Sequence, residues 1–250
     1  MSNICEVIQG KVIPRNFGNI KHLTESRLKD SGDTLLEESI QPYFTEKLQF
    51  PKRDKIYVTE KIDGANVGVY KSGGKLHPIM RKGYDVRTSE WGFIKRFADF
   101  VSDNTDRFDA LLVDGERVCG EWMIKTHSLF YILPHEPFIV FDIIKGVEKP
   151  TRSTFSDIQE RCHFHGFTTS TVIHEGDAIS VADALALLGN GFHGCQTAPE
   201  GLVYRYERDG TFEMSAKFVS NLYVGGDFMN DESAYNRWKD WRTERRELIP

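Results

Sequence analysis

Residues 57–70 constrain the fold more than any other stretch of the chain. β-Branched and aromatic residues fill positions 56–59 and alternate with other residues again over 67–70, which predicts two strands. Asp63-Gly64 lies between them and is a strong signal for a tight hairpin turn. The pattern therefore places Lys61 at the end of a strand, at the mouth of the turn, with an acidic residue on each side.

A lysine held in this way suits covalent catalysis by an amine, because the nucleophile must be positioned and partly deprotonated before it attacks. The competing interpretation is a solvated hairpin residue, since Lys-x-Asp-Gly is a short pattern that also arises by chance. The rest of the chain favours the catalytic interpretation.

The composition indicates a soluble intracellular protein. Its 250 residues fit one large domain, or a domain with a small appendage, and 40% hydrophobic residues are enough for a sizeable core. The sequence has no apolar run of about 18 residues that could cross a membrane. Residues 1–6 lack the basic start and apolar stretch of a signal peptide. We therefore expect a cytoplasmic location.

The cysteines and the net charge argue against two further classes. Four scattered cysteines without a Cys-x-x-Cys pair indicate a reducing compartment and disfavour a zinc site. The Cys-His-Phe-His cluster at 162–165 lacks a second ligand pair. A net charge of −5 argues against a protein that coats nucleic acid non-specifically. It is compatible with a local basic track, because phosphate binding depends on the charges that line one groove.

The hydrophobic periodicity predicts an α+β protein with mostly antiparallel sheets and helices on their outer faces. Asp33 and Ser89 are the expected N-caps of two helices. Pro78 is expected on an edge strand, because proline cannot donate a hydrogen bond to a ladder. Asp209-Gly210 predicts a hairpin. The remaining predicted strands cover residues 4–14, 75–81, 117–122, 137–144, 200–206 and 211–219. The predicted helices cover residues 33–38, 89–101, 154–165, 181–188 and 231–248.

Five short segments place a charged residue in or beside an apolar strand, where burial is costly unless the charge is paired or used. A structural ion pair is the simplest explanation for any one of them. Together with Lys61 they indicate a pocket for a polyanionic ligand and a metal ion. The five segments are residues 80–83, 119–122, 141–143, 199–203 and 215–219.

Six short motifs follow one another along the chain. They are EKIDG at 60–64, Arg81, GEW at 120–122, FIVFDI at 138–143, EGLVYR at 200–205 and Lys217. In this order they resemble the covalent nucleotidyltransferase superfamily of ATP-dependent ligases and capping enzymes, and most closely its ATP-dependent RNA ligases. The stretch 127–134 is similar to that family's sequence between its middle motifs. Each motif is weak alone, but the ordered set, over about residues 50–225, is specific.

The resemblance implies a nucleotidyltransferase (ATP-grasp-like) fold, in which antiparallel sheets flanked by helices hold the nucleotide in the groove between them. Residues 1–225 would form the adenylyltransferase domain. Residues 226–250 would form a short helical tail in place of a full C-terminal domain.

The resemblance also assigns the chemistry to three residues. Lys61 would attack the α-phosphate of ATP and become lysyl-AMP, with release of pyrophosphate. Glu200 would help to place a divalent ion, Mg²⁺ or Mn²⁺, which prefers oxygen ligands. Lys217 would neutralise the α-phosphate as charge builds in the transition state.

Four further residues would hold the nucleotide. Glu60 would help to bind the adenine, in part through backbone groups, and Phe141 would stack on it. Arg81 would touch the ribose or the donor 5′-phosphate, and Glu121 would accept hydrogen bonds from the ribose hydroxyls. Strand alternation points Phe138 and Phe141 to opposite faces, so only one of them can be the stacking platform.

The chain departs from the family pattern in its last motif and its tail. The family commonly carries two lysines one residue apart, whereas Val219 takes the place of the second one here. The tail could supply phosphate contacts through its basic residues, or these could be a solvated helix face. Those residues are Arg237, Lys239, Arg242, Arg245 and Arg246.

The function expected from these features is an ATP-dependent polynucleotide ligase, with RNA favoured over DNA. It would seal a 5′-phosphate to a 3′-hydroxyl through lysyl-AMP and an adenylylated 5′ end. Three alternatives stay open: a DNA ligase, a GTP-dependent guanylyltransferase of the capping type, and a non-catalytic nucleotide- or nucleic-acid-binding module.

Overall fold

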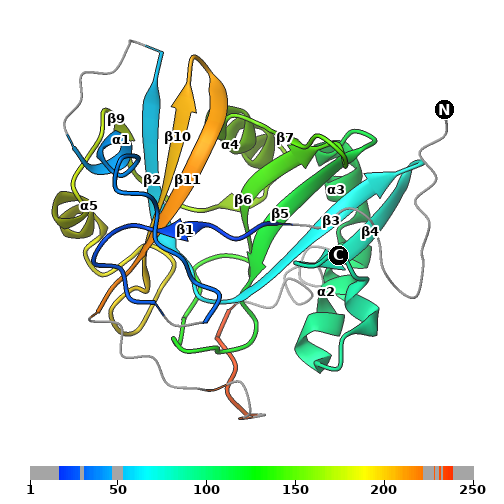
Figure 1. Cartoon of the computed structure of the whole chain (residues 1–250). Coiled ribbons are helices and arrows are strands. Elements are labelled where there is room, and N and C mark those ends of the chain that lie inside the picture. The colour runs from blue at the N-terminus through cyan, green and yellow to red at the C-terminus, as the bar shows by residue number, and fades with distance from the viewer. Residues whose placement is uncertain are drawn as a thin grey trace. The chain divides into compact units, whose positions relative to one another are not determined.

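The computed structural model describes residues 17–28, 31–46, 53–221, 228, 231 and 233–238. The chain forms two compact units, each built around one sheet (Figure 1). The first unit contains residues 1–18, 64–125 and 137–169, and the second contains residues 19–63, 126–136 and 170–250. The chain therefore passes from the second unit to the first between Asp63 and Gly64.

The second unit is built on a five-stranded sheet in the order β1-β11-β10-β2-β9. Every neighbouring pair is antiparallel except β1, which runs parallel to β11 at the edge. The strands are β1 (Lys21–His22), β2 (Lys55–Lys61), β9 (Val172–Gly176), β10 (Gly201–Arg208) and β11 (Thr211–Val219).

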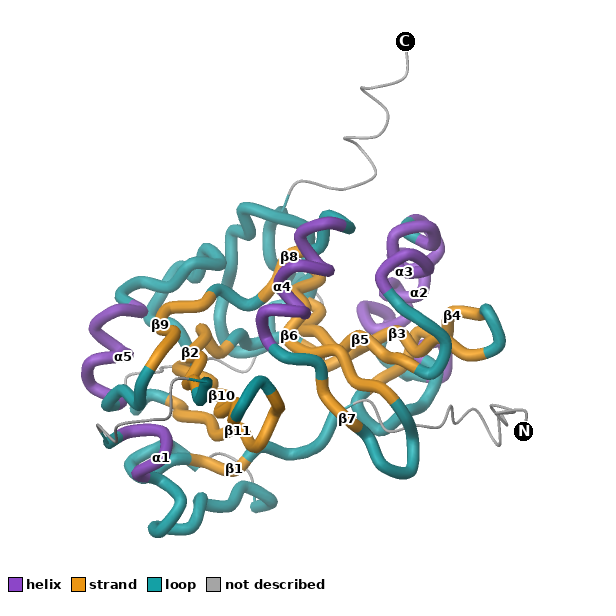
Figure 2. Tube along the Cα trace, turned by 90° about the horizontal axis from the view of Figure 1, so that it is seen from above, coloured by secondary structure: helices purple, strands orange, loops and turns teal. Residues whose placement is uncertain are grey.

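Helices α1 (Pro42–Thr45) and α5 (Val181–Leu188) lie on the same side of this sheet (Figure 2). Their buried side chains pack on alternate strand residues such as Ile56, Val58 and Leu202. Because successive strand residues point to opposite faces, the intervening residues of β2, β10 and β11 face away from the helices. Lys61 of β2 and Lys217 of β11 are among them, so the two lysines share the face opposite α1 and α5.

The first unit is built on a six-stranded sheet in the order β4-β3-β5-β6-β7, with β8 pairing parallel to β6. Its strands are β3 (Ala65–Ser72), β4 (Lys75–Met80), β5 (Glu116–Trp122), β6 (Phe138–Lys145), β7 (Thr151–Arg152) and β8 (Thr168–Thr169). Its helices are the short 3₁₀ turn η1 (Val86–Thr88), α2 (Gly92–Asp103), α3 (Thr105–Leu111) and α4 (Phe155–Phe164).

An aromatic cluster forms the core of the first unit. The ring of Phe97 on α2 lies 5.2 Å from that of Trp122 and 5.0 Å from that of Phe138, and all three are fully buried. Such tilted and edge-on arrangements add to the energy of burial. The aromatic side chains of α2 are therefore core packing.

The α+β class, the antiparallel sheets and most elements are confirmed. Pro78 lies on β4, the edge strand of its sheet, as its missing N–H requires. β10 and β11 form the hairpin predicted around Asp209-Gly210. No helix in the described part of the chain is long and apolar enough to cross a membrane.

The hairpin predicted at Asp63-Gly64 is wrong, because β2 and β3 belong to different sheets. Gly64 is not among the glycines with positive φ that a tight turn of this kind requires. A Cβ atom at Gly64 would lie 2.9 Å from the carbonyl oxygen of Trp122. Glycine is therefore needed here for a close approach to β5 and not for a turn.

The helix predicted over 33–38 is also wrong. The backbone N–H of His22 donates to the oxygen of Thr34 (2.8 Å), and the N–H of Leu36 donates to the oxygen of His22 (2.6 Å). The stretch 34–36 therefore runs beside β1, and Asp33 caps no helix. Ser89 does not cap α2 either: the N-cap is Trp91, whose N–H donates to the Ser89 hydroxyl at 3.2 Å.

Two further predictions concern the ends of the chain. The strand predicted over 4–14 and most of the helix predicted over 231–248 lie outside the described residues. Over 233–238 the helix is wrong, because the backbone pairs with another segment instead. Arg237 N–H donates to the oxygen of Tyr131 (2.9 Å), and Leu133 N–H donates to the oxygen of Arg237 (2.8 Å).

Candidate active site

Lys61 and Glu200 meet at the shared end of two strands. Lys61 is the last residue of β2 and lies opposite Gly201, the first residue of β10, so that Glu200 directly precedes the paired position. The Lys61 Nζ atom is 2.5 Å from Oε2 of Glu200. The lysine side chain is 21% exposed and the glutamate side chain 5%. The amine is thus partly accessible and is held by a nearly buried carboxylate.

Gly201 makes this meeting possible. Its φ of +155° is rare for residues with a side chain, and a Cβ atom would lie 1.9 Å from the carbonyl oxygen of Phe218. The backbone of Glu200 is fixed next to it, because Ser220 N–H donates to the Glu200 carbonyl at 2.9 Å. The glycine of the EGLVYR motif therefore serves the close packing of β10 on β11 just where the carboxylate must be placed.

Asp63, the second acid beside Lys61, anchors the backbone. Its Oδ2 atom accepts hydrogen bonds from the N–H groups of Ser128 (2.8 Å) and Leu129 (2.9 Å). Burial raises the pKa of Asp63, and the charge of Glu200 adds to this shift. The Asp63 N–H in turn donates to the Tyr131 hydroxyl at 3.3 Å. These bonds fix the chain two residues beyond the lysine.

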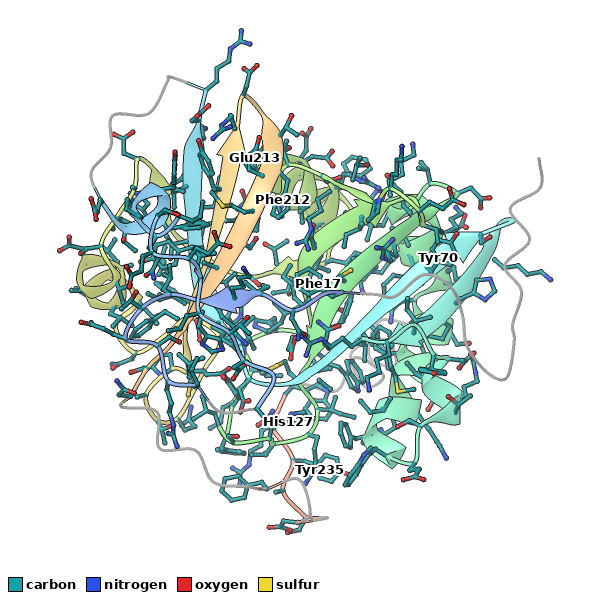
Figure 3. All side chains as sticks on the ribbon, viewed as in Figure 1. Phe17, Tyr70, His127, Phe212, Glu213 and Tyr235 are labelled. Atoms are coloured by element: carbon teal, nitrogen blue, oxygen red, sulfur yellow. The ribbon has the colours of Figure 1, made fainter. Side chains whose placement is uncertain are left out.

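The segment that holds Asp63 is itself held on two sides. Thr126 N–H donates to the oxygen of Ala234 (3.2 Å), so the stretches carrying His127 and Tyr235 run side by side (Figure 3). On the other side, Ile132 N–H donates to the oxygen of Gly194 at 2.9 Å. Asp63 is therefore hydrogen-bonded to a segment of the second unit that two other segments hold in place.

Glu60 points away from Lys61. Strand alternation puts its side chain on the helix-covered face with Ile56 and Val58. The carboxyl is buried, and its Oε2 atom accepts the N–H of Phe192 at 2.6 Å. Burial raises the pKa of Glu60 to about 7, and the backbone N–H of Phe192 only partly offsets this. The structure therefore does not bring the Glu60 carboxyl to the nucleophile.

A pair of buried histidines holds the loop that carries Phe192. His193 Nδ1 lies 2.8 Å from His135 Nε2, Thr171 N–H faces His193 Nε2 at 3.3 Å, and His135 Nδ1 faces the oxygen of Glu136 at 2.7 Å. These partners are satisfied only if both rings are neutral and each Nδ1 donates. Burial accordingly lowers the pKa of His135 and lowers that of His193 to about 3.

Lys217 is paired with Asp33, which the sequence analysis placed only at the start of a helix. Its Nζ atom lies 3.2 Å from Oδ1 of Asp33, and the same oxygen lies 3.0 Å from Nε2 of His22. No spacing or motif links these residues, because 184 positions separate Asp33 from Lys217. Sequence reasoning also missed His135 and His193, which lie 58 positions apart.

Phe141 occupies an irregular position in the sheet of the first unit. The register between β5 and β6 shifts beside it, so that Cys119 pairs with Asp142 and Gly120 with Val140. This bulge leaves Phe141 unpaired and half-buried, with its ring edge-on to Phe17 at 4.9 Å (Figure 3 labels Phe17). Phe138 is fully buried in the aromatic core, which leaves Phe141 as the available platform.

Arg81 and Glu121 also belong to the first unit. Arg81 is exposed and donates to the oxygen of Gly18 at 3.4 Å, while Phe17 N–H donates to the oxygen of Arg81 at 3.5 Å. Arg81 and Phe141 are thus brought to the same short segment, 17–18. Glu121 is half-buried on β5 and points away from the helices, because its neighbour Trp122 faces them.

The residues beside Lys61 suit a divalent metal ion that enters the site already bound to a substrate. Within the described ranges, no group of three or more His, Cys, Asp or Glu side chains could hold a metal on its own. Mg²⁺ commonly takes one or two carboxylates and completes its shell with substrate phosphates and water. Glu200 fits the role of such a carboxylate.

The comparisons with known proteins agree with this geometry. The model of the RNA ligase family matches residues 54–219, well over half of the chain. The chain belongs to the RNA ligase family. Comparison of this family member with curated protein sequences gave no match.

Three solved structures show the fold that this RNA ligase family member adopts. An archaeal ATP-dependent RNA ligase is 21% identical, with a TM-score of 0.52 over 84% of this chain and 49% of its own. A Naegleria gruberi RNA ligase with PPi is 17% identical, with a TM-score of 0.51 over 85% and 63%. A putative ATP-dependent DNA ligase from Aquifex aeolicus is 16% identical, with a TM-score of 0.51 over 84% and 52%. The nucleotidyltransferase fold is thereby confirmed, and the chain spans about half the length of the first of these.

Proposed function

We propose that this protein is an ATP-dependent RNA ligase that uses a divalent ion and seals 5′-phosphate to 3′-hydroxyl ends. The observation that carries the proposal is the 2.5 Å pair of Lys61 and Glu200 on the sheet face that also bears Lys217. Family membership over residues 54–219 supports the same chemistry.

In the first step, Nζ of Lys61 forms a bond to the α-phosphorus of ATP. The bond from that phosphorus to the bridging oxygen breaks, pyrophosphate leaves with the electron pair, and Nζ releases one proton to solvent water. The lysine must be a neutral amine when it attacks. Lys217 would offset the negative charge that builds on the α-phosphate oxygens.

Glu200 would hold the divalent ion, Mg²⁺ or Mn²⁺, which when bound supplies positive charge to the phosphates. A mutant of the Naegleria gruberi RNA ligase has been solved with ATP and Mn, which is consistent with this choice. The carboxylate of Glu200 would keep its place at the end of β10 throughout, since Gly201 and Ser220 fix its backbone.

Three residues of the first unit are assigned to the rest of the nucleotide. Phe141 would stack on the adenine, Glu121 would accept from the ribose hydroxyls, and Arg81 would contact the ribose or the donor phosphate. The half-buried state of Phe141 supports its assignment. Glu60 would contribute through its backbone alone, because its side chain faces the other side of β2.

The later steps transfer AMP to the 5′-phosphate of RNA and then join that end to a 3′-hydroxyl with release of AMP. We assign these activities to residues 1–225 and keep residues 226–250 as a short tail.

The test is labelling of the protein by α-³²P-ATP with Mg²⁺ or Mn²⁺. Wild type is expected to retain label, and Lys61→Ala is expected to retain none. Lys55→Ala is the matched control, because Lys55 lies on the same face of β2 and is also 2.5 Å from a glutamate, Glu175. An unlabelled wild type with either ion would defeat the proposal.

A second assay separates the remaining candidates. Unlabelled GTP that competes as well as ATP would indicate a guanylyltransferase. A panel of nicked and single-stranded substrates, with RNA or DNA on each side of the break, distinguishes RNA ligase from DNA ligase, which the Aquifex aeolicus structure keeps as a candidate. Sealing only of DNA nicks would contradict the assignment to RNA.

A further inference from the structure

Asp33, the partner of Lys217, lies in a chain reversal that precedes β2. β1 runs parallel to β11, with His22 directly opposite Lys217. Leu23 N–H donates to the oxygen of Lys217 (2.8 Å), and Arg27 N–H donates to the oxygen of Val219 (2.9 Å). The chain then returns beside β1 and brings Asp33 over the same face.

The buried ring of His22 lies against the Asp33 carboxylate. The Ser26 hydroxyl accepts the N–H of Val219 at 2.9 Å and lies 2.6 Å from Nδ1 of His22. The Ser26 hydroxyl therefore ties Nδ1 of His22 to β11, and Nε2 of the ring faces Asp33. Nε2 is 3.0 Å from the Asp33 oxygen but is not aligned for a good hydrogen bond, so the contact is mainly electrostatic. Burial lowers the pKa of His22, and the neighbouring Lys217 acts in the same direction.

The exposed fraction of the side chain increases from His22 through Asp33 to Lys217. The side chain of His22 is 1% exposed, that of Asp33 14% and that of Lys217 21%. His22 is thus the buried member of the cluster, and Lys217 is the member that solvent reaches most. An anion that approaches Lys217 meets Asp33 as a competitor for the same ammonium group.

This competition matters because the second cation of the motif is missing. Val219 stands where the family commonly has a lysine, and Val219 carries no charge to share. Under the proposed function, Lys217 must serve the α-phosphate, yet here it is already paired at 3.2 Å. A phosphate oxygen that binds the lysine competes with the carboxylate for the same ammonium group.

We propose that Asp33, supported by His22, is a positioning residue. It holds Lys217 over the sheet face until a nucleotide phosphate replaces Asp33 as the main partner of the ammonium group. The inference rests on the proposed function. It predicts that Asp33 weakens nucleotide binding and at the same time keeps the lysine in the place where the phosphate arrives.

The test compares Asp33→Asn with Asp33→Ala. Asparagine keeps an oxygen for Lys217 but removes the charge, so we expect ATP to bind about five- to tenfold more tightly with the rate of label transfer retained. Alanine removes the charge and the support, so we expect tighter binding together with slower transfer. A purely structural role would not split affinity from rate in this way.

Asp209→Asn is the matched control, because Asp209 lies in the same unit and pairs with Arg53 at the same 3.2 Å. It changes the net charge equally and is expected to leave ATP affinity unchanged. Equal ATP affinity of wild type and Asp33→Asn would overturn the inference, as would an equal gain in Asp209→Asn.

Binding is measured by calorimetry with ATP in the Lys61→Ala background, in which no transfer takes place, and with inorganic pyrophosphate in the wild-type background. A wild type that binds ATP but takes no label refutes the proposed function alone, and the affinity of Asp33→Asn then still decides the inference. A wild type that binds neither compound refutes both.

Discussion

Glu60 and Lys61 are neighbours in sequence, and their side chains point to opposite faces of the same sheet. The amine lies on the face opposite α1 and α5 and meets Glu200, whereas the Glu60 carboxyl is buried beneath the loop that carries Phe192. The two acids that flank the lysine in sequence thus share one role. Glu60 and Asp63 hold backbone segments, and the carboxylate beside Lys61 comes from far along the chain.

Glu200→Ala and Lys217→Ala should both keep ATP binding and lose most transfer. Each removes a charge that acts on the phosphates, and the loss of one such group commonly costs about 10²- to 10³-fold in rate. Single-turnover labelling gives the rate, and calorimetry gives the affinity. Normal labelling rates in both variants would mean that this face of the sheet is not the active site.

Glu60→Gln should change how stability depends on pH. The carboxyl has a folded pKa of about 7 against an ordinary value of 4.5. Between these two values the folded protein binds the proton more tightly than the unfolded chain does, so wild type loses stability as pH rises from 4.5 to 7. The full loss amounts to about 3 kcal/mol.

The glutamine variant lacks this titration. Its free energy of unfolding in urea, relative to that of wild type, should therefore increase from pH 5 to pH 8. Parallel curves for the two proteins across that range would show that Glu60 is ionised when folded.

His193→Gln should have the opposite pH dependence. The pKa of His193 is lowered from 6.5 to about 3, so below pH 6.5 the unfolded chain takes up a proton that the folded protein does not. Wild type therefore loses stability as pH falls through this window, by about 2 kcal/mol between pH 6.5 and pH 5. The variant should lose less over the same interval.

Gly201→Ala should be strongly destabilising. Its Cβ atom would overlap the carbonyl oxygen of Phe218, so β10 or β11 must shift, at a cost of about 3 kcal/mol or more. Gly210→Ala is the control at the far end of the same hairpin. Gly210 also has positive φ, +74°, but open space around it, so about 1 kcal/mol is expected. Urea denaturation measures both, and equal losses would show that β10 tolerates a side chain at its first residue.

The same dipeptide signal was right once and wrong once, and the reason is physical. Asp209-Gly210 does join paired strands, because both positions adopt positive φ. Asp63-Gly64 does not, because the glycine there makes room for the backbone of Trp122. A local pattern reports that glycine is needed and does not say whether a turn or a distant carbonyl needs it.

The strands and amphipathic helices could be predicted because their periodicity is local. Lys61, Glu200 and Lys217 could be picked out because each sits in a short motif with a fixed place in the series. Asp33 could not, since its role depends on a chain reversal beside β1 that no residue pattern announces. Its expected place as a helix cap was reasonable for an aspartate before apolar residues, but the stretch after it pairs with His22 instead.

The two hydrogen bonds on the Asp63 carboxylate have a further consequence for Lys61. With the ladder of β2 on one side and this anchor on the other, the lysine backbone has no slack in either direction. Under the proposed function, the distance that the amine covers would have to come from its own four methylene groups. The phosphorus atom would then be carried to the lysine, and a slow motion in the cycle would belong to the nucleotide or to the groups that grip it.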